Sequence, residues 1–289
     1  MVKPFLRWAG GKRWLASKIA PIIRLRIDNH LYIEPFLGSG SMFFEINPIR
    51  ALLSDLNQSL IITFKEVSRD PISLEQRLLS IKPSKREYYR IRKWSPINNQ
   101  DIALRFIYLN RNCWGGLYRE NRMGIFNVPY GGNERSHIGI CSKGILHSVG
   151  KVLSNPMINL EHCDYKESIK QAKKGDIIYC DPTYRQVTRK HFDRYGSTIF
   201  SWDDQHQLAI MANMLFKKGV FILISNASYY GIKDLYPNAA VIEVCRRKGL
   251  GTNGNPSDRT EFLFVLDPKQ QWHEWELVGR IIHTPANIV

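Results

Sequence analysis

The chain has 289 residues, of which 44% are hydrophobic, so it is long enough for one large domain or two of ordinary size. No apolar run approaches the roughly 20 residues of a membrane helix, and the first residues carry charges and tryptophans where a signal peptide is apolar. We therefore expect a folded, cytoplasmic protein without a membrane partner. The formal charge of +15 favours a polyanionic partner, because basic side chains release counterions when they neutralise phosphates.

The five cysteines are widely spaced and form neither a Cys-x-x-Cys pair nor a Cys/His cluster with zinc-ligand spacing. We expect free thiols and no metal site. Basic residues gather in two stretches, 82–93 and 185–194. An exposed helix face explains the first stretch as well as a phosphate-binding surface does.

In chain order, apolar runs predict buried strands of a mostly parallel sheet at 31–35, 51–55, 157–162, 176–180 and 219–225. Two further runs, 239–244 and 260–266, are close enough to form an antiparallel hairpin. Between them, residues 203–219 show a helical pattern with acids at its start and Lys-Lys-Gly at its end. Alternating strands and helices predict an α/β doubly wound fold.

The stretch from about residue 58 to 145 interrupts this alternation. It is basic, rich in helix formers at first, and then rich in Gly, Asn and Arg. We expect a smaller, helical domain that ends in a long loop or hairpin and is inserted into the first domain. The predicted parts are therefore 1–57, 58–145 and 146–289.

Ligands of an open parallel sheet bind beyond the carboxyl ends of its strands, so the residues after each strand are the candidate site. In "EPFLGSGSMFFE", Gly38 and Gly40 allow a tight turn into a helix, whereas Phe43 stands where a dinucleotide fingerprint needs a third glycine. Asp55 ends the second strand, where an acid accepts hydrogen bonds from ribose hydroxyls. A nucleoside without pyrophosphate fits this pattern, and S-adenosylmethionine is the candidate.

Two other segments are candidates for the same ligand. "FLRWAGGKR" contains Trp8, whose ring would cover the cofactor, and Lys12, whose ammonium would bind the methionine carboxylate. The alternative is a tail packed on the sheet. Asp164 and Tyr165 follow the third strand and are expected near the adenine.

The stretch "IIYCDPTY" places Asp181, Pro182 and Tyr184 directly after an apolar run. A buried strand that enters an ordinary Asp-Pro turn explains the pattern equally well on its own.

Six stretches in this order resemble the Dam-type (class D12) DNA adenine-N6 methyltransferases: "FLRWAGGKR", "YIEPFLGSGS", "LLSDLN", "YLNRNCWGGLYRENRMGIFNVPYG", "IIYCDPTY" and "LISNA". They span roughly residues 5–265. The resemblance implies a class I, Rossmann-like methyltransferase fold, S-adenosylmethionine as methyl donor, and a target-recognition domain between a cofactor half and a catalytic half.

Residue roles follow from the matching motif positions. The resemblance implies cofactor contacts at Trp8, Lys12, Asp55 and Asp181. It also implies a DNA-reading segment at 111–130, in which Arg119, Asn121, Arg122 and Asn127 would meet base edges or phosphates. Lys85 and Arg86 of the first basic stretch are expected to contact phosphates.

Methylation of an adenine amino group is the chemistry implied. Acceptors at the Asp181 carboxylate and the Pro182 carbonyl would favour a tetrahedral nitrogen, and Tyr184 would stack on a base flipped out of the duplex. The family usually has a second proline where this chain has Thr183, but both acceptors remain, so we expect activity.

Two alternatives stay open at this point: methylation of another amino group, such as cytosine N4 or an RNA base, and a DNA-binding protein without catalysis. Double-stranded DNA is the expected partner of a monomer, and a restriction endonuclease is a further candidate partner.

Overall fold

The computed structural model describes residues 2–8, 10–121, 123–132, 143–182, 200–229, 231–246 and 259–285. The chain divides into two compact units. The first unit comprises Met1–Arg13 with Leu37–Tyr165, and the second comprises Trp14–Phe36 with Lys166–Val289.

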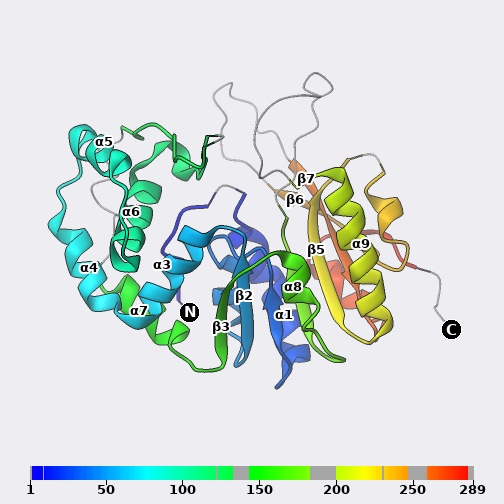
Figure 1. The fold of residues 1–289 in the computed structure, drawn as a ribbon. Coiled ribbons are helices and arrows are strands. Elements are labelled where there is room, and N and C mark those ends of the chain that lie inside the picture. The colour runs from blue at the N-terminus through cyan, green and yellow to red at the C-terminus, as the bar shows by residue number, and fades with distance from the viewer. Residues whose placement is uncertain are drawn as a thin grey trace. The chain divides into compact units, whose positions relative to one another are not determined.

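The first unit is mainly helical. It contains α2 (Ser41–Ile46), β2 (Ala51–Asp55), α3 (Gln58–Arg69), α4 (Pro71–Ser80), α5 (Lys85–Lys93), α6 (Asn99–Asn112), a 3-10 turn (Trp114–Gly116), α7 (Ile145–Leu153) and β3 (Ile158–His162). Helices α4 to α7 gather into a bundle (Figure 1), and α3 packs against both α6 and α7. Strands β2 and β3 pair in parallel, with Asp55 opposite His162.

Side-chain caps explain why these helices begin where they do. The side chain of Asn57 accepts from the Leu60 N–H at the start of α3, and Asn98 caps α6 in the same way. Asp70 caps α4, whose first residue is a proline. Each cap satisfies one of the backbone N–H groups that a helix start leaves without an intrahelical partner.

The second unit carries most of the sheet. It contains α1 (Arg13–Ile27), β1 (Tyr32–Glu34), α8 (Tyr165–Ile169), β4 (Ile177–Cys180), α9 (Trp202–Lys217), β5 (Phe221–Ala227), a 3-10 turn (Lys233–Leu235), β6 (Ala240–Arg246), β7 (Arg259–Leu266), a 3-10 stretch (Trp272–Leu277) and β8 (Arg280–His283), with α1 and α8 each beginning on the last residue of the first unit. Within it the strand order is β1-β4-β5-β7-β6-β8. The pairs β1/β4 and β4/β5 are parallel, and the later pairs are antiparallel.

The predicted α/β fold with a parallel sheet and an antiparallel C-terminal hairpin is confirmed. All seven expected strands are present, and β2 has the predicted bounds. The elements that the sequence analysis missed include the helices α1, α7 and α8 and the strand β8. Strand β8 has only four residues, none of them buried, and α1 contains a proline, so neither gives a clear periodic signal.

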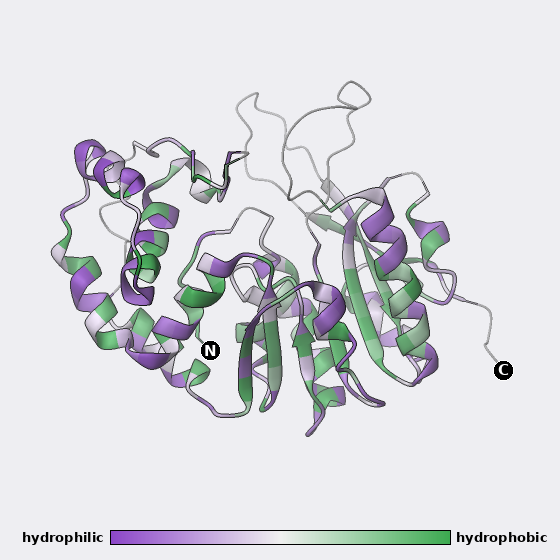
Figure 2. Ribbon diagram, viewed as in Figure 1, coloured by the Kyte–Doolittle hydropathy of each residue, from purple (hydrophilic) through white to green (hydrophobic). Residues whose placement is uncertain are grey.

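The strand that precedes the candidate catalytic motif, β4, and its neighbour in the sheet, β5, are buried. All four residues of β4 are buried, as are six of the seven residues of β5, and Figure 2 shows β5 hydrophobic along most of its length. Parallel strands covered on both faces are expected to be apolar throughout. The core therefore holds the end of β4 firmly.

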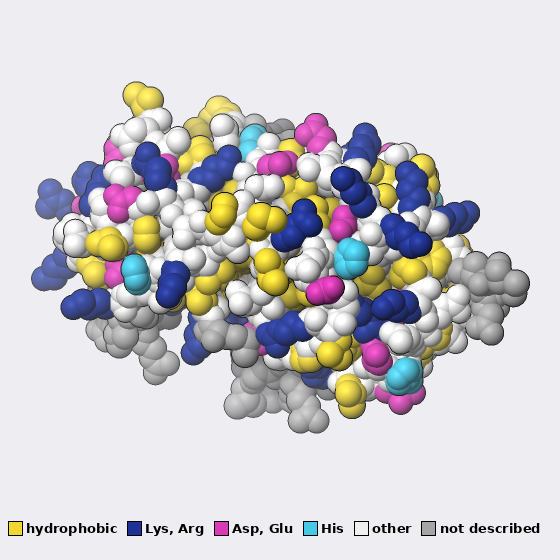
Figure 3. Space-filling model, turned by 90° about the horizontal axis from the view of Figure 1, so that it is seen from below, with side chains coloured by type: hydrophobic (Ala, Val, Ile, Leu, Met, Phe, Trp, Pro, Cys, Tyr) yellow, Lys and Arg dark blue, Asp and Glu magenta, His cyan; other side chains and the backbone are white. Residues whose placement is uncertain are grey.

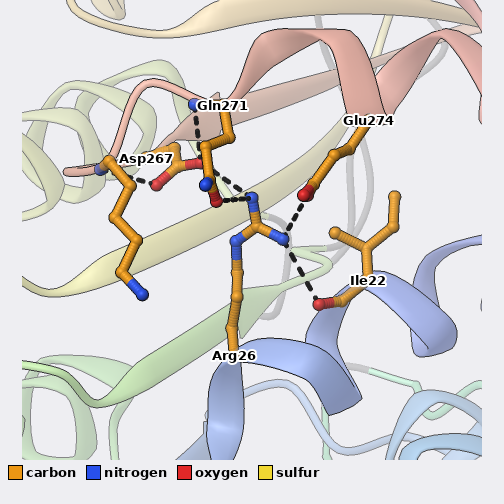
Figure 4. Close-up of polar contacts among 6 residues, drawn as sticks. Ile22, Arg26, Asp267, Gln271 and Glu274 are labelled. Carbon is orange, nitrogen blue, oxygen red and sulfur yellow. Dashed lines mark hydrogen bonds and ion pairs between the residues drawn. The ribbon is translucent and has the colours of Figure 1, made fainter.

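Arg26 fixes α1 within the second unit (Figure 4). One of its amino groups donates to Asp267 at 3.1 Å and to Gln271 at 3.1 Å, and the other pairs with Glu274. The side chains of Arg26 and Asp267 are only 7% and 1% exposed. Removing one partner of a buried ion pair costs about 3–5 kcal/mol, so this network ties α1 to the chain that follows β7.

Candidate active site

The glycine loop and Asp55 lie together in the first unit. Gly38 has a φ of +49°, and its N–H donates to Asp55 Oδ2 at 3.0 Å. The N–H of Asn57 donates to Asp55 Oδ1 at 2.9 Å. Gly40, with a φ of +68°, is the N-cap residue of α2. The loop therefore turns sharply after β1 and holds the carboxylate that ends β2.

The surroundings of Asp55 set its protonation. Burial raises the pKa of Asp55, and the N–H groups of Gly38 and Asn57 lower it in part. The charge of His162 lowers this pKa as well. The sequence analysis did not single out His162, although it is the last residue of a strand that points to the same sheet edge.

The segment around Trp8 packs on the glycine loop. A Cβ built on Gly38 would lie 2.8 Å from Trp8 Nε1, so the indole covers this glycine closely. The Trp8 ring also stacks on Tyr118, with ring centroids 6.0 Å apart. Lys12 is buried, and its Nζ lies 3.4 Å from the carbonyl oxygen of Gly10.

Asp164 and Tyr165 follow β3 in the first unit. Tyr165 is buried and begins α8, whereas Asp164 is half-buried.

Among the predicted cofactor residues of the first unit, the structure joins Trp8, Gly38 and Asp55 by direct contacts.

The described residues of the candidate catalytic motif lie in the second unit. Asp181 is half-buried and Pro182 is buried, directly after β4. Thr183 and Tyr184 lie outside the described residues, as does the second basic stretch, 185–194.

Buried polar side chains lie on the strands of this unit. Tyr32 donates to Glu34 at 2.9 Å, and the hydroxyls of Tyr179 and Ser225 are 2.9 Å apart. Burial raises the pKa of Tyr179, and the charge of Asp181 raises it further. Burial raises the pKa of Tyr32 as well, so both tyrosine hydroxyls stay neutral. Glu34 and Ser225 lie in motifs quoted above but were given no role there.

The segment 111–130 folds as a hairpin. Isolated antiparallel bridges join Cys113 to Tyr130 and Glu120 to Phe126. Backbone hydrogen bonds join both strands of the hairpin, including Asn127 N–H to Arg119 O at 3.1 Å. We call residues 113–130 the recognition hairpin, after the DNA-reading role that the sequence predicts for them. The predicted long loop or hairpin is thereby confirmed as a hairpin.

Side chains of the recognition hairpin hold its shape. Arg119 Nε donates to Asn127 Oδ1 at 2.8 Å, so these two residues form a pair across the hairpin. Asn121 Oδ1 accepts from the N–H groups of Met123 and Ile125, both at 3.0 Å. Because that oxygen closes the turn, Asn121 cannot make a bidentate contact with adenine while the turn stays closed. Arg122 lies outside the described residues.

The first basic stretch has members of two kinds. Lys85 and Arg86 are exposed in the first turn of α5. Arg90 pairs with Glu87, and Arg92 lies 4.7 Å above the Tyr89 ring and donates to Val128 O at 3.2 Å. Arg92 therefore supports the recognition hairpin.

Comparisons with known proteins decide the family. A family model described as D12 class N6 adenine-specific DNA methyltransferase matches residues 8–249, more than half of the chain. The chain belongs to this family. It is a site-specific adenine DNA methyltransferase of mixed α/β fold, and the resemblance inferred from the sequence is confirmed.

Relatives of this methyltransferase cover most of its length. The type II methyltransferase M1.LlaDCHI of Lactococcus lactis subsp. cremoris is 33% identical over 262 residues, which are 86% of this chain and 90% of the relative. The type II methyltransferase M.MjaIII of Methanocaldococcus jannaschii is 31% identical over 279 residues, 88% of this chain and 94% of the relative. A DNA adenine methylase of Serratia marcescens is 31% identical over 259 residues, 87% and 93% of the two chains.

Two other features are absent from the described part of this methyltransferase. No helix there is long and apolar enough to cross a membrane. No group of three or more His, Cys, Asp or Glu side chains in the same residues could hold a metal ion.

Proposed function

We propose that this methyltransferase transfers a methyl group from S-adenosylmethionine to the N6 atom of an adenine flipped out of a short, specific DNA sequence. The observation that carries the proposal is the position of Asp181 and Pro182. They follow β4, all of whose residues are buried, so the packed core holds both groups in place. The groups are the Asp181 carboxylate and the backbone carbonyl of Pro182, a residue that has no N–H.

The side chains of the first unit fit the cofactor chemically. The Asp55 carboxylate suits two ribose hydroxyls, and the Lys12 ammonium suits the methionine carboxylate. Gly38 and Gly40 let the backbone approach a ligand closely, while Trp8 supplies an aromatic face and Asp164 and Tyr165 are proposed for the adenine. When bound, S-adenosylmethionine supplies an activated methyl group on sulfur.

The residues after β4 prepare the adenine for attack. The N6 lone pair is delocalised into the ring, so the amino group is a weak nucleophile. Asp181 and the Pro182 carbonyl each accept a hydrogen bond from one N6–H, which favours a tetrahedral nitrogen and offsets the positive charge that develops on it. Tyr184 stacks on the flipped base in this proposal.

DNA recognition is assigned to the predicted inserted domain, residues 58–145, which covers α3 to α6 and the recognition hairpin. Arg119 and Asn127 are proposed base-reading residues, and their mutual hydrogen bond orients the Arg119 guanidinium in advance. The base-reading roles of Asn121 and Arg122 stay predictions, and Arg122 lies outside the described residues. Lys85 and Arg86 are proposed to contact phosphates, which position a protein without specifying sequence.

The test uses labelled S-adenosylmethionine with duplex DNA, RNA and single-stranded DNA. We expect transfer to adenine N6 in duplex DNA only, and labelled cytosine N4 or RNA would contradict the proposal. Asp181→Ala should lower methyl transfer by about 100-fold or more, because one charge-stabilising acceptor is removed. Asp234→Ala, which removes an exposed acid of the same unit, is the control. Near-wild-type turnover of the Asp181 variant would rule out the proposed chemistry.

A partner endonuclease is a second part of the proposal. Two relatives are named type II methyltransferases, whereas others are named DNA adenine methylases. Sequencing methylated bases in DNA from cells that express the protein would give the recognition sequence, and a nuclease blocked at that sequence would be the partner. A cytoplasmic location and a monomeric state stay predictions.

A further inference from the structure

Asn110 holds the backbone of Arg7 with both ends of its side-chain amide. The Arg7 N–H donates to Asn110 Oδ1 at 2.8 Å, and Asn110 Nδ2 donates to the Arg7 carbonyl at 2.7 Å. Asn110 lies in the last turn of α6, is 1% exposed, and reaches a residue 103 positions away in the chain. A single buried side chain thus fixes both the place and the orientation of the peptide groups before Trp8.

Neighbouring contacts secure the same segment against the recognition hairpin. A Cβ built on Gly116 would lie 2.6 Å from the Cβ of Arg7, so these two segments of the chain are in close contact. Trp8 stacks on Tyr118, which in turn packs on Phe126 with ring centroids 5.5 Å apart. Tyr118 and Phe126 lie on opposite strands of the hairpin.

Trp8 also contacts the proposed cofactor residues. Its indole covers Gly38, whose N–H donates to Asp55. Contacts therefore run without a break from the recognition hairpin through Trp8 to the carboxylate proposed for the ribose. All of these residues belong to the first unit.

We propose that Asn110 is a positioning residue that couples cofactor binding to the reading of the DNA sequence. This inference rests on the proposed function. By holding Arg7 and hence Trp8 in contact with both Tyr118 and Gly38, Asn110 makes the order of the glycine loop and the order of the recognition hairpin depend on each other. Two sites that share an ordered element bind their ligands cooperatively, and the coupling is the same in both directions.

The experiment measures the dissociation constant of S-adenosylhomocysteine, the demethylated cofactor, with and without a duplex that contains the preferred sequence. The ratio of the two constants is the coupling factor. We expect a factor within the range of about 5–150 for the wild type, since couplings of this size are typical. In Asn110→Asp, which keeps the acceptor but loses the donor to the Arg7 carbonyl, the factor should fall at least fivefold towards one.

Asn213→Asp is the matched control. Asn213 lies in α9, and its Nδ2 also donates to backbone carbonyls, those of Ala209 at 2.8 Å and Leu235 at 3.3 Å. The same chemical exchange there should leave the coupling factor at its wild-type value. An equal fall in the Asn213 variant would show a general effect of destabilisation and would overturn the proposal.

Asn110→Ala is a second variant, which removes both hydrogen bonds to Arg7. A wild-type coupling factor in either Asn110 variant would overturn the inference. Loss of cooperative thermal unfolding in both variants would assign Asn110 to fold stability alone and would overturn it equally. Failure of the proposed function is separate, because it appears as absence of methyl transfer by the wild type. If the wild type transfers methyl groups but has a coupling factor of one, only the proposed role of Asn110 is contradicted.

Discussion

Asp55 has a carboxylate suited to ligand binding, but burial makes its ionised form less stable in the free protein. Burial raises the pKa of its carboxyl, while two backbone N–H groups lower that pKa only in part. The carboxylate is therefore less well stabilised in the fold than in water. Ribose hydroxyls would add two donors and favour the ionised form, so cofactor binding should remove a proton from Asp55 wherever it is still protonated.

The first prediction concerns the pH dependence of cofactor affinity. Affinity should fall as the pH is lowered through the raised pKa of Asp55, and it should be flat above that pKa. Asp55→Asn should bind about 10–100-fold more weakly, because hydrogen bonds to a charged group contribute about 1.5–3 kcal/mol each, and it should lose the pH dependence. Calorimetry over a pH series tests both points. An inflection at or below the ordinary aspartate pKa, about 3.9, would contradict the assignment.

A comparison of alanine substitutions at Gly38 and Gly10 distinguishes the effect of backbone strain from the effect of a collision with the Trp8 indole. Gly38 and Gly10 both have positive φ, but a Cβ meets Trp8 at Gly38 and nothing within 4 Å at Gly10. Gly38→Ala should lower stability by about 1–3 kcal/mol and also change tryptophan fluorescence and cofactor affinity, because the indole must move. Gly10→Ala should show the strain without the change in fluorescence. Equal fluorescence changes in the two variants would show that the indole does not depend on Gly38.

At the scale of elements, the recognition hairpin is held by one of its own polar side chains and by one from α5. Asn121 supplies the acceptor for two N–H groups of the turn, and Arg92 of α5 donates to the carbonyl of Val128 near its base. A composition rich in Asn and Arg suggested residues free to meet bases. Part of that polarity instead keeps the hairpin in shape.

Replacement of Asn121 should therefore act on the whole hairpin. Asn121→Ala leaves two N–H groups of the turn without their acceptor, so discrimination should weaken at several base positions together. Asn121→Asp keeps the acceptor and should retain most of the wild-type ranking. Methylation rates over single-base variants of the preferred sequence give the measurement. Relaxation at one base position only, in the alanine variant, would instead favour direct reading by Asn121.

At the scale of the whole molecule, the chain carries a net charge of +15. In the view of Figure 3, Lys and Arg side chains are scattered among uncharged ones. Long-range attraction to DNA is thus a property of the whole chain, whereas phosphate contacts belong to particular residues.

Paired charge removals distinguish the two effects. The double variant Lys85→Ala with Arg86→Ala should weaken binding to all duplexes alike and lower the slope of log affinity against log salt by roughly 0.9 for each phosphate that is no longer neutralised. The double variant Lys217→Ala with Lys218→Ala removes the same charge from the exposed end of α9 and should leave the slope nearly unchanged. Equal slopes in the two double variants would place the phosphate-binding residues elsewhere.

The sequence by itself determined the family and seven of the eight strands in the described part of the chain. Strand β2 has the predicted bounds because its apolar run ends abruptly at Asp55, and the hairpin of β6 and β7 follows from two close apolar runs. Motifs such as "IIYCDPTY" keep their residue types together in the chain, so the family and its reaction could be predicted from them. These features depend on local patterns.

Only the tertiary structure decided which side chains support others. The amide of Asn110 holds Arg7 across 103 positions, and the Trp8 indole covers Gly38, pairings that no local pattern encodes. Arg92 looked like surface charge but supports Val128, 36 positions away. The physical reason is that a polar side chain gains its role from the backbone groups that folding brings to it. Periodicity reports burial along one element and carries no information about those distant partners.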